Sequence, residues 1–273
     1  MYQNKIYDVI IIGASEEGLA LSDYLMKRAP TLKLAIVSKN FNNLSEKHKL
    51  DNVLYLQKEV IFSSYMRGLI GFTLNDMTNI YCTNAVIATG STPEKLAFES
   101  NNIYYKTADV KNTSKSRQVI VLGEDREAIQ TAEWAAKKFR YVYLCSKSMK
   151  LAASTKELDK LARIENIVHL PNCYPVSFKN DNNGNLVETT LSTYDTIRSD
   201  AIIAITKRKP DIPRLYNKMI EVKDGYIVIN HFGETSIIPK IFALGACTKY
   251  TSKRNITTVG RRILSINGWK QED

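Results

Sequence analysis

The stretch "IIGASEEG", residues 11–18, decides how the first part of the chain folds. It has the first and last glycines of a G-x-G-x-x-G turn, Gly13 and Gly18, while Ser15 takes the place of the middle glycine. Such a turn brings backbone N–H groups at a helix N-terminus close to a phosphate, because glycines put no side chain in the way. Two glutamates follow the serine, at the point where a phosphate would lie. The stretch therefore raises the question of whether this turn holds an anion.

The sequence around the turn has the order strand, turn, helix, strand. An apolar run at 7–12 comes before it, and an apolar-striped segment at 19–28, ended by Pro30, comes after it. The next apolar run, "LKLAIVS" at 32–38, predicts a second strand. In this context the glycines predict a nucleotide-binding α/β module, whereas the same glycines alone would be weak evidence.

A second module of the same kind lies later in the chain. "QVIVLG" at 118–123 predicts a strand, "REAIQTAEWAAKKF" at 126–139 a helix with a stripe of small residues, and "YVYLCS" at 141–146 another strand. Further β-like runs predict an antiparallel meander within 53–90 that turns at Asn75-Asp76, and buried strands at 200–206 and 240–247. We expect the last of these strands to return to the first module.

The composition is that of a globular protein with an excess of positive charge. Hydrophobic residues make up 44% of the 273 residues and charged residues 24%, which is enough for a core. No apolar run has the length of a membrane helix, and the start lacks the pattern of a signal peptide, so we expect a cytoplasmic protein without membrane contact. The net charge of +10 favours acidic partners. The basic residues are scattered and not interleaved with aromatic ones, which argues against nucleic-acid binding.

The four cysteines, Cys82, Cys145, Cys173 and Cys247, are far apart in the sequence. No C-x-x-C pattern exists, so local spacing predicts neither a redox-active dithiol nor a zinc knuckle. The three histidines are not near other ligand types at metal spacing. We therefore expect buried structural thiols and no metal site, and no residue can be named as a catalytic acid, base or nucleophile.

Five motifs in order give a resemblance to a known family. They are "YDVIIIGASEEG" (7–18), "AVIATGSTP" (85–93), "QVIVLGEDREA" (118–128), "AIIAITKRKPDIPRL" (201–215) and "TSIIPKIFALGAC" (235–247). Together they resemble the thioredoxin-reductase-like flavoproteins, a group that includes thioredoxin reductases and bacterial ferredoxin–NADP reductases. The resemblance implies an α/β fold of two Rossmann-like, three-layer domains. The FAD-binding-type domain would be split, at 1–112 plus 236–273, and the NAD(P)-binding-type domain would be inserted at 113–235.

The resemblance also implies where FAD would lie. The pyrophosphate would lie at the turn 13–18, the adenosine ribose near Ser38, the adenine near Val60 and the flavin near Gly245. The candidate cofactor-binding residues are Gly13, Ala14, Ser15, Gly18, Ser38, Val60, Ala88, Thr89, Gly90, Gly245 and Ala246.

Several positions depart from the family pattern. Lys106 and Asp109 occupy the approximate positions of the redox cysteines, which disfavours direct thioredoxin reduction. The surrounding stretch, "NIYYKTADVKN", is closer to the cysteine-free ferredoxin–NADP reductases. At the closing motif the family's Gly-Asp has become Gly245-Ala246, which removes a hydrogen bond to the FAD ribitol and about 1–3 kcal/mol of affinity.

The second nucleotide fingerprint is eroded further. Only Gly123 and the small Ala128 remain, and Glu124 and Asp125 replace glycines. Carboxylates repel a pyrophosphate, by about 1 kcal/mol per unit pair at ~4 Å in water and by more when desolvated. Lys147 alone remains where the family has an arginine pair for the 2′-phosphate. This pattern argues against NAD(P)H binding in the usual manner.

Two interpretations of Glu16 and Glu17 stay open. They border a bound pyrophosphate, or they stabilise the helix at a vacated anion site through the helix dipole, by about 0.3–1 kcal/mol each. Accordingly, the chain is expected to be an FAD-dependent oxidoreductase without a redox dithiol and with an eroded NAD(P) site. The alternative is a non-catalytic homologue that has lost both cofactors and acts as a binding or regulatory scaffold. The resemblance implies a homodimer, and the charge favours an electron-transfer or acidic protein as partner.

Overall fold

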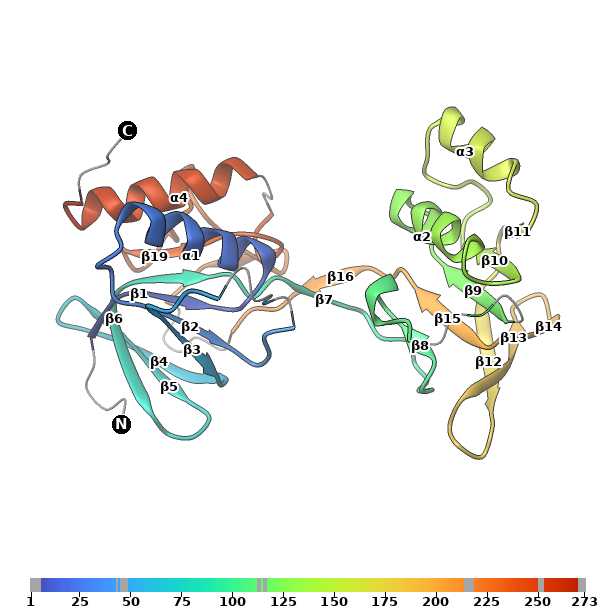
Figure 1. The fold of residues 1–273 in the computed structure, drawn as a ribbon, viewed down its shortest axis with the longest axis horizontal. Helices are drawn as coiled ribbons and strands as arrows, with labels where there is room; N and C mark the ends of the chain where they lie inside the picture. Colours follow the sequence, from blue (N-terminus) through green and yellow to red (C-terminus); the bar gives the residue numbers. More distant parts are fainter. Residues whose placement is uncertain are drawn as a thin grey trace. The chain divides into compact units, whose positions relative to one another are not determined.

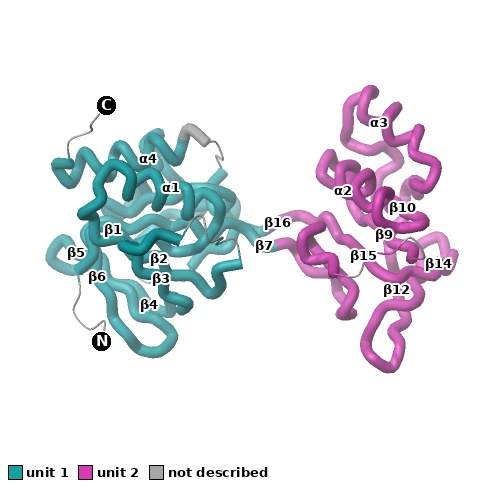
Figure 2. Tube along the Cα trace, viewed as in Figure 1, with its two compact units in different colours: residues 1–92, 209–273 teal, residues 93–208 magenta. Residues whose placement is uncertain are grey.

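The chain folds into two compact units, as the computed structural model shows (Figure 2). The structure describes residues 6–42, 44, 49–111, 114, 117–213, 219–249 and 253–269, without the side chains of 253 and 254. Unit 1 consists of residues 1–92 and 209–273, and unit 2 of residues 93–208.

These boundaries differ from the expected ones, although the second unit is inserted in the first as predicted. Residues 93–111 belong to unit 2 because they supply a strand that pairs with its sheet, at Ile103 and Tyr104. Met219 and Ile227 belong to unit 1 because they pack in its core. The expected boundary at 112/113 itself lies outside the described residues.

Unit 1 is built on a seven-stranded sheet with the path β3-β2-β1-β6-β5-β4, and β19 pairs with β6 beside this path (Figure 1). Its elements are β1 (Ile6–Ile12), α1 (Glu16–Arg28), β2 (Leu34–Ser38), β3 (Val53–Gln57), β4 (Val60–Met66), β5 (Leu69–Leu74), β6 (Asn79–Ile87), β17 (Val222–Lys223), β18 (Tyr226–Ile227), β19 (Ile241–Ala243) and α4 (Lys253–Ile266). β7 (Ser91–Pro93) and β16 (Arg208–Pro210) form a separate two-stranded sheet where the chain passes between the units.

Strand direction in this sheet confirms the predicted organisation. β1 pairs in parallel with β2 and with β6, and β19 pairs in parallel with β6, so the last strand returns to the first module. β4, β5 and β6 form the predicted antiparallel meander, with the turn at Asn75 and Asp76. The carboxyl ends of β1, β2, β6 and β19 therefore meet at one edge, which is where open α/β sheets bind ligands.

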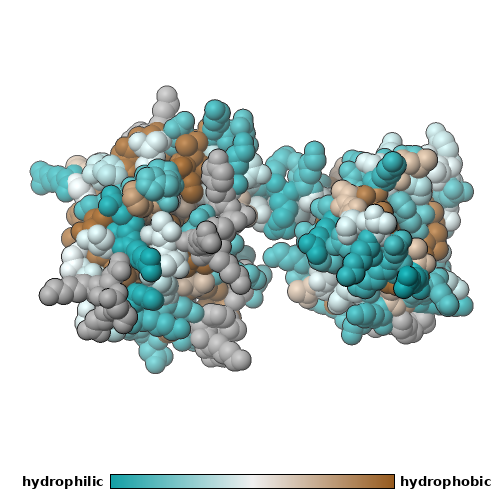
Figure 3. Space-filling view, turned by 90° about the horizontal axis from the view of Figure 1, so that it is seen from above, coloured by the Kyte–Doolittle hydropathy of each residue, from teal (hydrophilic) through white to brown (hydrophobic). Residues whose placement is uncertain are grey.

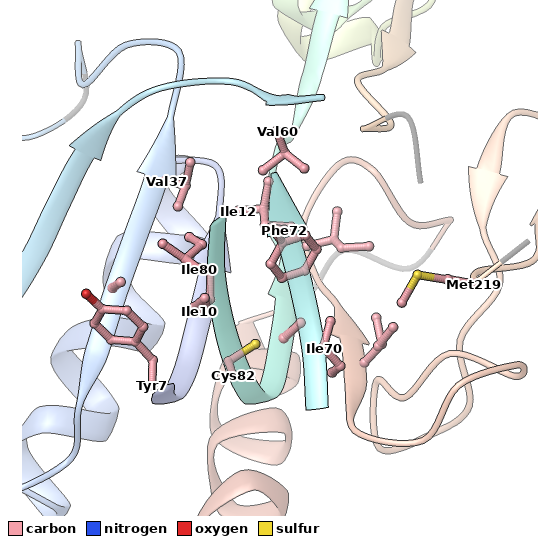
Figure 4. Packing of buried hydrophobic residues seen from close by; sticks show 14 of the residues in the cluster. Tyr7, Ile10, Ile12, Val37, Val60, Ile70, Phe72, Ile80, Cys82 and Met219 are labelled. Carbon is pink, nitrogen blue, oxygen red and sulfur yellow. The ribbon is translucent and has the colours of Figure 1, made fainter. Parts of the chain in front are cut away.

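Two hydrophobic clusters cover the two faces of this sheet. Helices α1 and α4 pack over one face, where they contact β1 residues Val9 and Ile11. On the other face, Ile10 and Ile12 pack against the meander and against Met219 (Figure 4). Alternate residues of a strand point to opposite faces, so a β1 that is apolar on both faces requires both layers.

Unit 2 has a five-stranded parallel sheet in the order β11-β10-β9-β15-β8. Its elements are β8 (Ile103–Tyr104), the 3-10 helix η2 (Thr107–Asp109), β9 (Gln118–Leu122), α2 (Arg126–Ala136), β10 (Tyr141–Cys145), α3 (Thr155–Ala162), β11 (Ile167–Leu170), β12 (Pro175–Asn180), β13 (Leu186–Leu191), β14 (Thr196–Arg198) and β15 (Ala201–Ala204). The small residues of α2 pack on one face of the sheet, and the three-stranded sheet β12-β13-β14 contributes to a cluster on the other. The predicted three-layer α/β architecture is thus confirmed in both units.

The surface drawn in Figure 3 is mainly hydrophilic over each unit, with hydrophobic residues in small areas. No helix among the described residues combines the length and the apolar character needed to cross a membrane.

Candidate functional site at the first glycine turn

The sequence-predicted site residues of unit 1 gather at the carboxyl edge of its parallel strands. The turn 13–15 follows β1, Ala88 and Gly90 follow β6, and Gly245 follows β19. Ser38 ends β2 at the same edge. Residues separated by more than two hundred positions in the sequence therefore line one region of unit 1.

Gly13 and Gly18 are needed for the close approach of backbone segments. Gly13 has a φ of +103°, and a Cβ on it would lie 2.4 Å from the carbonyl oxygen of Ala88. A Cβ on Gly18 would lie 2.9 Å from the Cβ of Ala88 and 3.0 Å from the carbonyl oxygen of Gly13. The two glycines thus let helix α1 and the turn after β6 pack directly on each other, which is the role that such glycines have in nucleotide-binding turns.

Ser15 is the N-cap of α1. Its hydroxyl accepts a hydrogen bond from the backbone N–H of Gly18 at 3.2 Å. Within the described residues, the backbone N–H groups of Glu16 and Glu17 donate to no protein acceptor. The first turn of a helix always has such donors, and together with the helix dipole they attract an anion. The cap is neutral, so this N-terminus has no internal negative charge in the capping position.

The two glutamates of this turn have different environments. Glu16 is exposed, so its carboxylate is solvated. Glu17 is half-buried, and its side chain lies over Gly245, where an added Cβ would be 3.0 Å from the carboxylate oxygen Oε2. Gly245 has a φ of +80°, which favours glycine, and here it also leaves room for the glutamate. A carboxylate from α1 thus lies beside the Gly245-Ala246 position.

Hydrogen bonds to Asp211, the residue that follows β16, hold the turn after β6 in place. The hydroxyl of Thr89 donates to the carbonyl oxygen of Asp211, and the backbone N–H of Asp211 donates to the carbonyl oxygen of Gly90 at 3.0 Å. Gly90 has a φ of +72° and lies opposite Ser15, with 3.7 Å between the Ser15 Cβ and the position of an added Cβ. The Thr89 hydroxyl therefore holds the turn after β6 in place, and Gly90 puts no side chain into the space next to Ser15.

The remaining predicted residues differ in how they are placed. The hydroxyl of Ser38 donates to the carbonyl oxygen of Asn40 at 2.6 Å. The Val60 side chain packs in the core with Phe72 and Ile12, so only its backbone could contact a ligand (Figure 4). Ala14 is buried in the cluster beneath α1. Ala246 is half-buried next to Gly245.

Cys247 is a structural thiol in this arrangement. It is fully buried and donates to the carbonyl oxygens of Leu244 at 3.2 Å and of Ile87 at 3.5 Å. Burial raises its pKa to about 11, so the thiol is protonated at neutral pH. Cys82 is also completely buried, in the core of unit 1 (Figure 4).

The second glycine turn, in unit 2, also joins a strand to a capped helix, but the side chain that caps this helix is a carboxylate. Gly123 has a φ of +148°, and a Cβ there would lie 2.7 Å from the Cβ of Ala128. The N-cap of α2 is Asp125, whose carboxylate oxygen accepts from the backbone N–H of Ala128 at 2.9 Å. A negative side chain of the protein thus lies at the position where the first-turn donors would meet a phosphate.

Glu124, in this second turn, accepts hydrogen bonds from the segment that follows β10. Its carboxylate accepts a hydrogen bond from the backbone N–H of Ser148 at 3.0 Å, and its carbonyl oxygen accepts one from Ala152 at 2.6 Å. Hydrogen bonding to Ser148, helped by the charges of Lys147 and Lys207, lowers the pKa of Glu124. Lys147, which stands at the place of the family's arginine pair, therefore has a carboxylate of the protein near it.

Sequence reasoning missed two arrangements that depend on distant contacts. These are the position of Glu17 over Gly245 and a contact of 2.9 Å between Ser146 Oγ and His169 Nε2. Asp125 as a helix N-cap could have been found, because an aspartate directly before an amphipathic run is a capping signal.

The Ser146–His169 pair is not arranged as a nucleophile and its base. The Ser146 hydroxyl donates its proton to the carbonyl oxygen of Ser148 at 2.8 Å, so Nε2 of His169 is the donor toward Ser146. Burial lowers the pKa of His169, which favours the neutral ring. Among the described residues, no group of three histidine, cysteine, aspartate or glutamate side chains could hold a metal ion.

Comparison with solved structures gives close similarity in fold at low sequence identity. Thioredoxin reductase from Lactococcus lactis (FR conformation) matches with a TM-score of 0.78 and 16% identity, over 95% of this chain and 98% of that chain. Thioredoxin reductase from T. acidophilum matches with a TM-score of 0.77 and 17% identity, over 97% of this chain and 99% of that chain. At these identities the similarity establishes a common fold.

Sequence comparison identifies the family. No curated protein sequence matches the chain significantly. The family model described as pyridine nucleotide-disulphide oxidoreductase matches residues 37–262, which is well over half of the chain. The expected resemblance is thereby confirmed at the level of family and fold, and the chain belongs to the pyridine nucleotide-disulphide oxidoreductase family.

Proposed function

We propose that this chain is an FAD-binding oxidoreductase that holds the cofactor in unit 1 and does not take its electrons from a pyridine nucleotide held in unit 2. The difference between the two helix caps carries this proposal. Ser15 caps α1 with a neutral hydroxyl, whereas Asp125 caps α2 with a carboxylate. An anionic cofactor is therefore attracted to the first turn and repelled by the second.

The residues of unit 1 fit the pyrophosphate of FAD. Gly13 and Gly18 allow close backbone approach, the N–H groups of Glu16 and Glu17 are available as donors, and Gly90 leaves space in front of Ser15. Ser38, Ala88, Thr89, Gly245 and Ala246 lie along the same edge and would border the rest of the cofactor. FAD would supply the electron chemistry, while the protein binds and orients it.

Glu17 acts against tight binding in this proposal. Its half-buried carboxylate lies beside Gly245, close to the helix N-terminus that would face the pyrophosphate. Replacing it with a neutral side chain of the same shape removes a like charge worth about 1 kcal/mol, or roughly fivefold in affinity. Glu16 carries the same charge on the same helical turn, but it is exposed. The two glutamates thus form a matched pair for a test.

The electron donor is then a partner and not NAD(P)H bound in unit 2. The net charge of +10 favours an acidic electron-transfer protein, because opposite net charges speed association. The proposal includes a homodimer, which the family resemblance implies.

The test is a titration of the purified chain with FAD, followed by anaerobic addition of NADPH or NADH. We expect binding of FAD with a shift in its visible absorbance, and no bleaching by either nucleotide. We expect Glu17→Gln to bind FAD about fivefold more tightly, and Glu16→Gln to change the affinity by less than twofold. Bleaching by NADPH or NADH would overturn the account of unit 2, and equal effects of the two variants would overturn the role of Glu17.

A specific observation favours a second candidate, a non-catalytic scaffold. Carboxylates of the protein lie at or beside both glycine turns, at Glu17 and at Asp125. If the chain shows no absorbance change at saturating FAD, and Glu17→Gln does not restore binding, the scaffold function replaces the flavoprotein function.

A further inference from the structure

One edge of the unit 1 sheet is a strand that pairs on one side only. β4 is the last strand of the sheet path, so one of its sides pairs with β5, and no strand of the described residues pairs with the other, which we call its outer side. Such an edge presents a row of N–H and C=O groups that can pair with another strand. The outer side of β4 is therefore a template for an added strand.

The hairpin turn between β4 and β5 decides which backbone groups face this outer side. Arg67 and Gly68 form a two-residue turn with φ values of +53° and +81°, and Met66 pairs with Leu69 across it. With only two residues between them, Met66 and Leu69 bond to each other through their backbone N–H and C=O groups. This pair fixes the hydrogen-bonding phase of the whole strand.

From Met66 back along β4, hydrogen-bonded and non-hydrogen-bonded pairs alternate, as in every antiparallel ladder. Ser64 pairs with Gly71 and bonds to β5, whereas the backbone groups of Ser63 and Tyr65 point to the outer side. Among the described residues, the N–H and C=O groups of Ser63 and Tyr65 form no hydrogen bond. Their spacing of two residues is the one that an antiparallel partner strand requires.

β4 has few of the features that protect natural sheet edges. Its seven residues, Val60–Met66, include no charged residue and no proline, and the bulge in its pairing lies at Ile61. Tyr65 and Met66 are 42% and 71% exposed. Charges, prolines and bulges are the usual means by which proteins keep edge strands apart. Nothing in the sequence of β4 after Ile61 opposes a partner strand.

We propose that two copies of this chain pair through the outer sides of their β4 strands, antiparallel and related by a twofold axis at Ser64. The inference rests on the homodimer that the proposed function includes, and it gives this homodimer its interface without depending on FAD. A second copy fits better than a foreign strand because the edge is self-complementary: the two residues that face outward, Ser63 and Tyr65, lie symmetrically about Ser64.

The register follows from these outward groups. Ser63 of each copy pairs with Tyr65 of the other, and each of these two pairs forms two backbone hydrogen bonds. Ser64 then lies opposite Ser64 of the second copy as a non-hydrogen-bonded pair, with about 4.5 Å between the Cα atoms. This register uses the whole regular stretch 62–66 and leaves the bulge at Ile61 outside it.

The side chains agree with the same register. Alternate residues share a face of a strand, so Phe62, Ser64 and Met66 lie on one face. Phe62, which is 40% exposed, comes opposite Met66 of the second copy on both sides of the small Ser64. Contacts between a methionine sulfur and an aromatic ring are favourable. A slip of two residues in either direction would break both Phe62–Met66 pairs.

The charges at the two ends of β4 also favour antiparallel pairing. Glu59 comes directly before the strand and Arg67 directly after it, and both are exposed. Glu59 also lies 3.0 Å from Lys39 through its Oε1 atom. Antiparallel pairing brings Glu59 of one copy towards Arg67 of the second at each end of the interface, and opposite charges in such positions select the orientation of a partner.

Cysteine cross-linking of the full chain tests the register. The four native cysteines are buried, so an added surface cysteine reports on its own position. Ser64→Cys should give a disulfide-linked dimer on mild oxidation, because Cα atoms about 4.5 Å apart are within disulfide range. Met66→Cys is the matched control. Met66 lies on the same face and is more exposed, but its equivalent in the second copy is about 14 Å away along the strand, so no cross-link should form.

Light scattering during gel filtration tests the interface itself. We expect the unchanged chain to have twice the mass of a single copy, which is 31.0 kDa. Ser64→Lys and Ser64→Glu each place like charges opposite each other at the axis, so each should raise the dissociation constant of the dimer about fivefold or more. Mixing the two variants should restore the dimer, and this rescue also shows that both variants are folded.

Three results would overturn the proposal. They are the mass of a single copy at micromolar concentrations, cross-linking of Met66→Cys as fast as that of Ser64→Cys, and a dimer that Ser64→Lys does not weaken. An FAD titration of the same samples keeps the flavin function separate. A single copy that binds FAD overturns only the interface, whereas a dimer that follows the expected register and does not bind FAD overturns only the flavin function.

Discussion

The two glycine turns of this chain have nearly the same backbone and opposite chemistry. Each follows a central parallel strand, each begins with a glycine at positive φ, and each is capped by a side chain three residues before the N–H that it accepts from. In unit 1 the cap is the neutral hydroxyl of Ser15, and in unit 2 it is the carboxylate of Asp125. The positive end of the α1 dipole is not paired with a charged cap, whereas at α2 a carboxylate of the protein caps the positive end of the dipole.

On the proposed function, unit 2 keeps the fold of a nucleotide-binding turn without holding the ligand. A capping carboxylate stabilises the helix as a bound phosphate would, so nothing in the packing around α2 has to change. Its small residues still pack on the sheet at Ala128, Ala132 and Ala135. The cap is therefore one difference between the turns that can be tested by substitution.

The largest effect is expected for Gly13→Ala. The left-handed conformation alone costs about 1–3 kcal/mol with a side chain present, and the new Cβ would lie 2.4 Å from the carbonyl oxygen of Ala88. Urea unfolding should show a loss of at least this size, together with loss of FAD binding. Gly68→Ala is the matched control, since Gly68 has a φ of +81° but no atom within 4 Å of an added Cβ. Equal losses for both variants would show that contact with Ala88 is unimportant.

Exchange of the caps gives the next largest effect. Ser15→Asp should transfer the chemistry of the second turn to the first, so that α1 remains capped while FAD affinity falls at least tenfold, or about 1.4 kcal/mol. Fluorescence titration with FAD and thermal unfolding of the same samples measure the two quantities. An unchanged FAD affinity in a folded Ser15→Asp variant would contradict the proposed importance of cap charge.

A smaller effect is expected for Asp125→Ala in unit 2. Loss of the N-cap should lower the free energy of unfolding by about 0.5–2 kcal/mol, because the N–H of Ala128 loses its acceptor. Asp125→Asn keeps an acceptor and removes the charge, and it should recover most of the stability in a denaturant titration. If Asp125→Ala is as stable as the unchanged chain, the carboxylate does not act as a cap in solution.

The smallest effect concerns the pH dependence of unit 2. Hydrogen bonding to Ser148 lowers the pKa of Glu124 in the folded chain. A group whose folded pKa is depressed contributes stability above its unfolded pKa and loses it as the pH falls through the folded value. Unit 2 should therefore lose part of its stability below about pH 4, and Glu124→Gln should make the unfolding midpoint less dependent on pH in this range. Identical pH profiles for the two proteins would be inconsistent with this role.

The sequence predicted much of the fold because the relevant signals are local. The strand runs at 7–12 and 118–123 and the helical stripes at 19–28 and 126–139 correspond to β1, β9, α1 and α2. α1 begins earlier than its apolar stripe, at Glu16, because Ser15 caps it. α2 ends earlier than expected, at Ala136, although Phe139 still packs in the same cluster. Element ends depend on capping hydrogen bonds, which periodicity does not show.

The candidate site was predictable as a set of motifs but not as an arrangement. The glycine spacing and the segments 85–93 and 235–247 indicate which residues gather, since parallel strands place their carboxyl ends at one edge. The environments of Glu16 and Glu17 were not predictable, because one carboxylate is solvated and the other lies over Gly245, a residue 228 positions away.

By itself, the sequence determined the two strand–turn–helix modules, the return of the last strand to the first module and the absence of a local C-x-x-C dithiol. Hydrophobic periodicity and glycine placement act over a few residues, so they can be recognised without knowing the partners. Only the tertiary structure decided the unit boundaries, the position of Glu17 and the contact of Ser146 with His169. These features depend on strand order and register, which bring distant residues together through long-range packing.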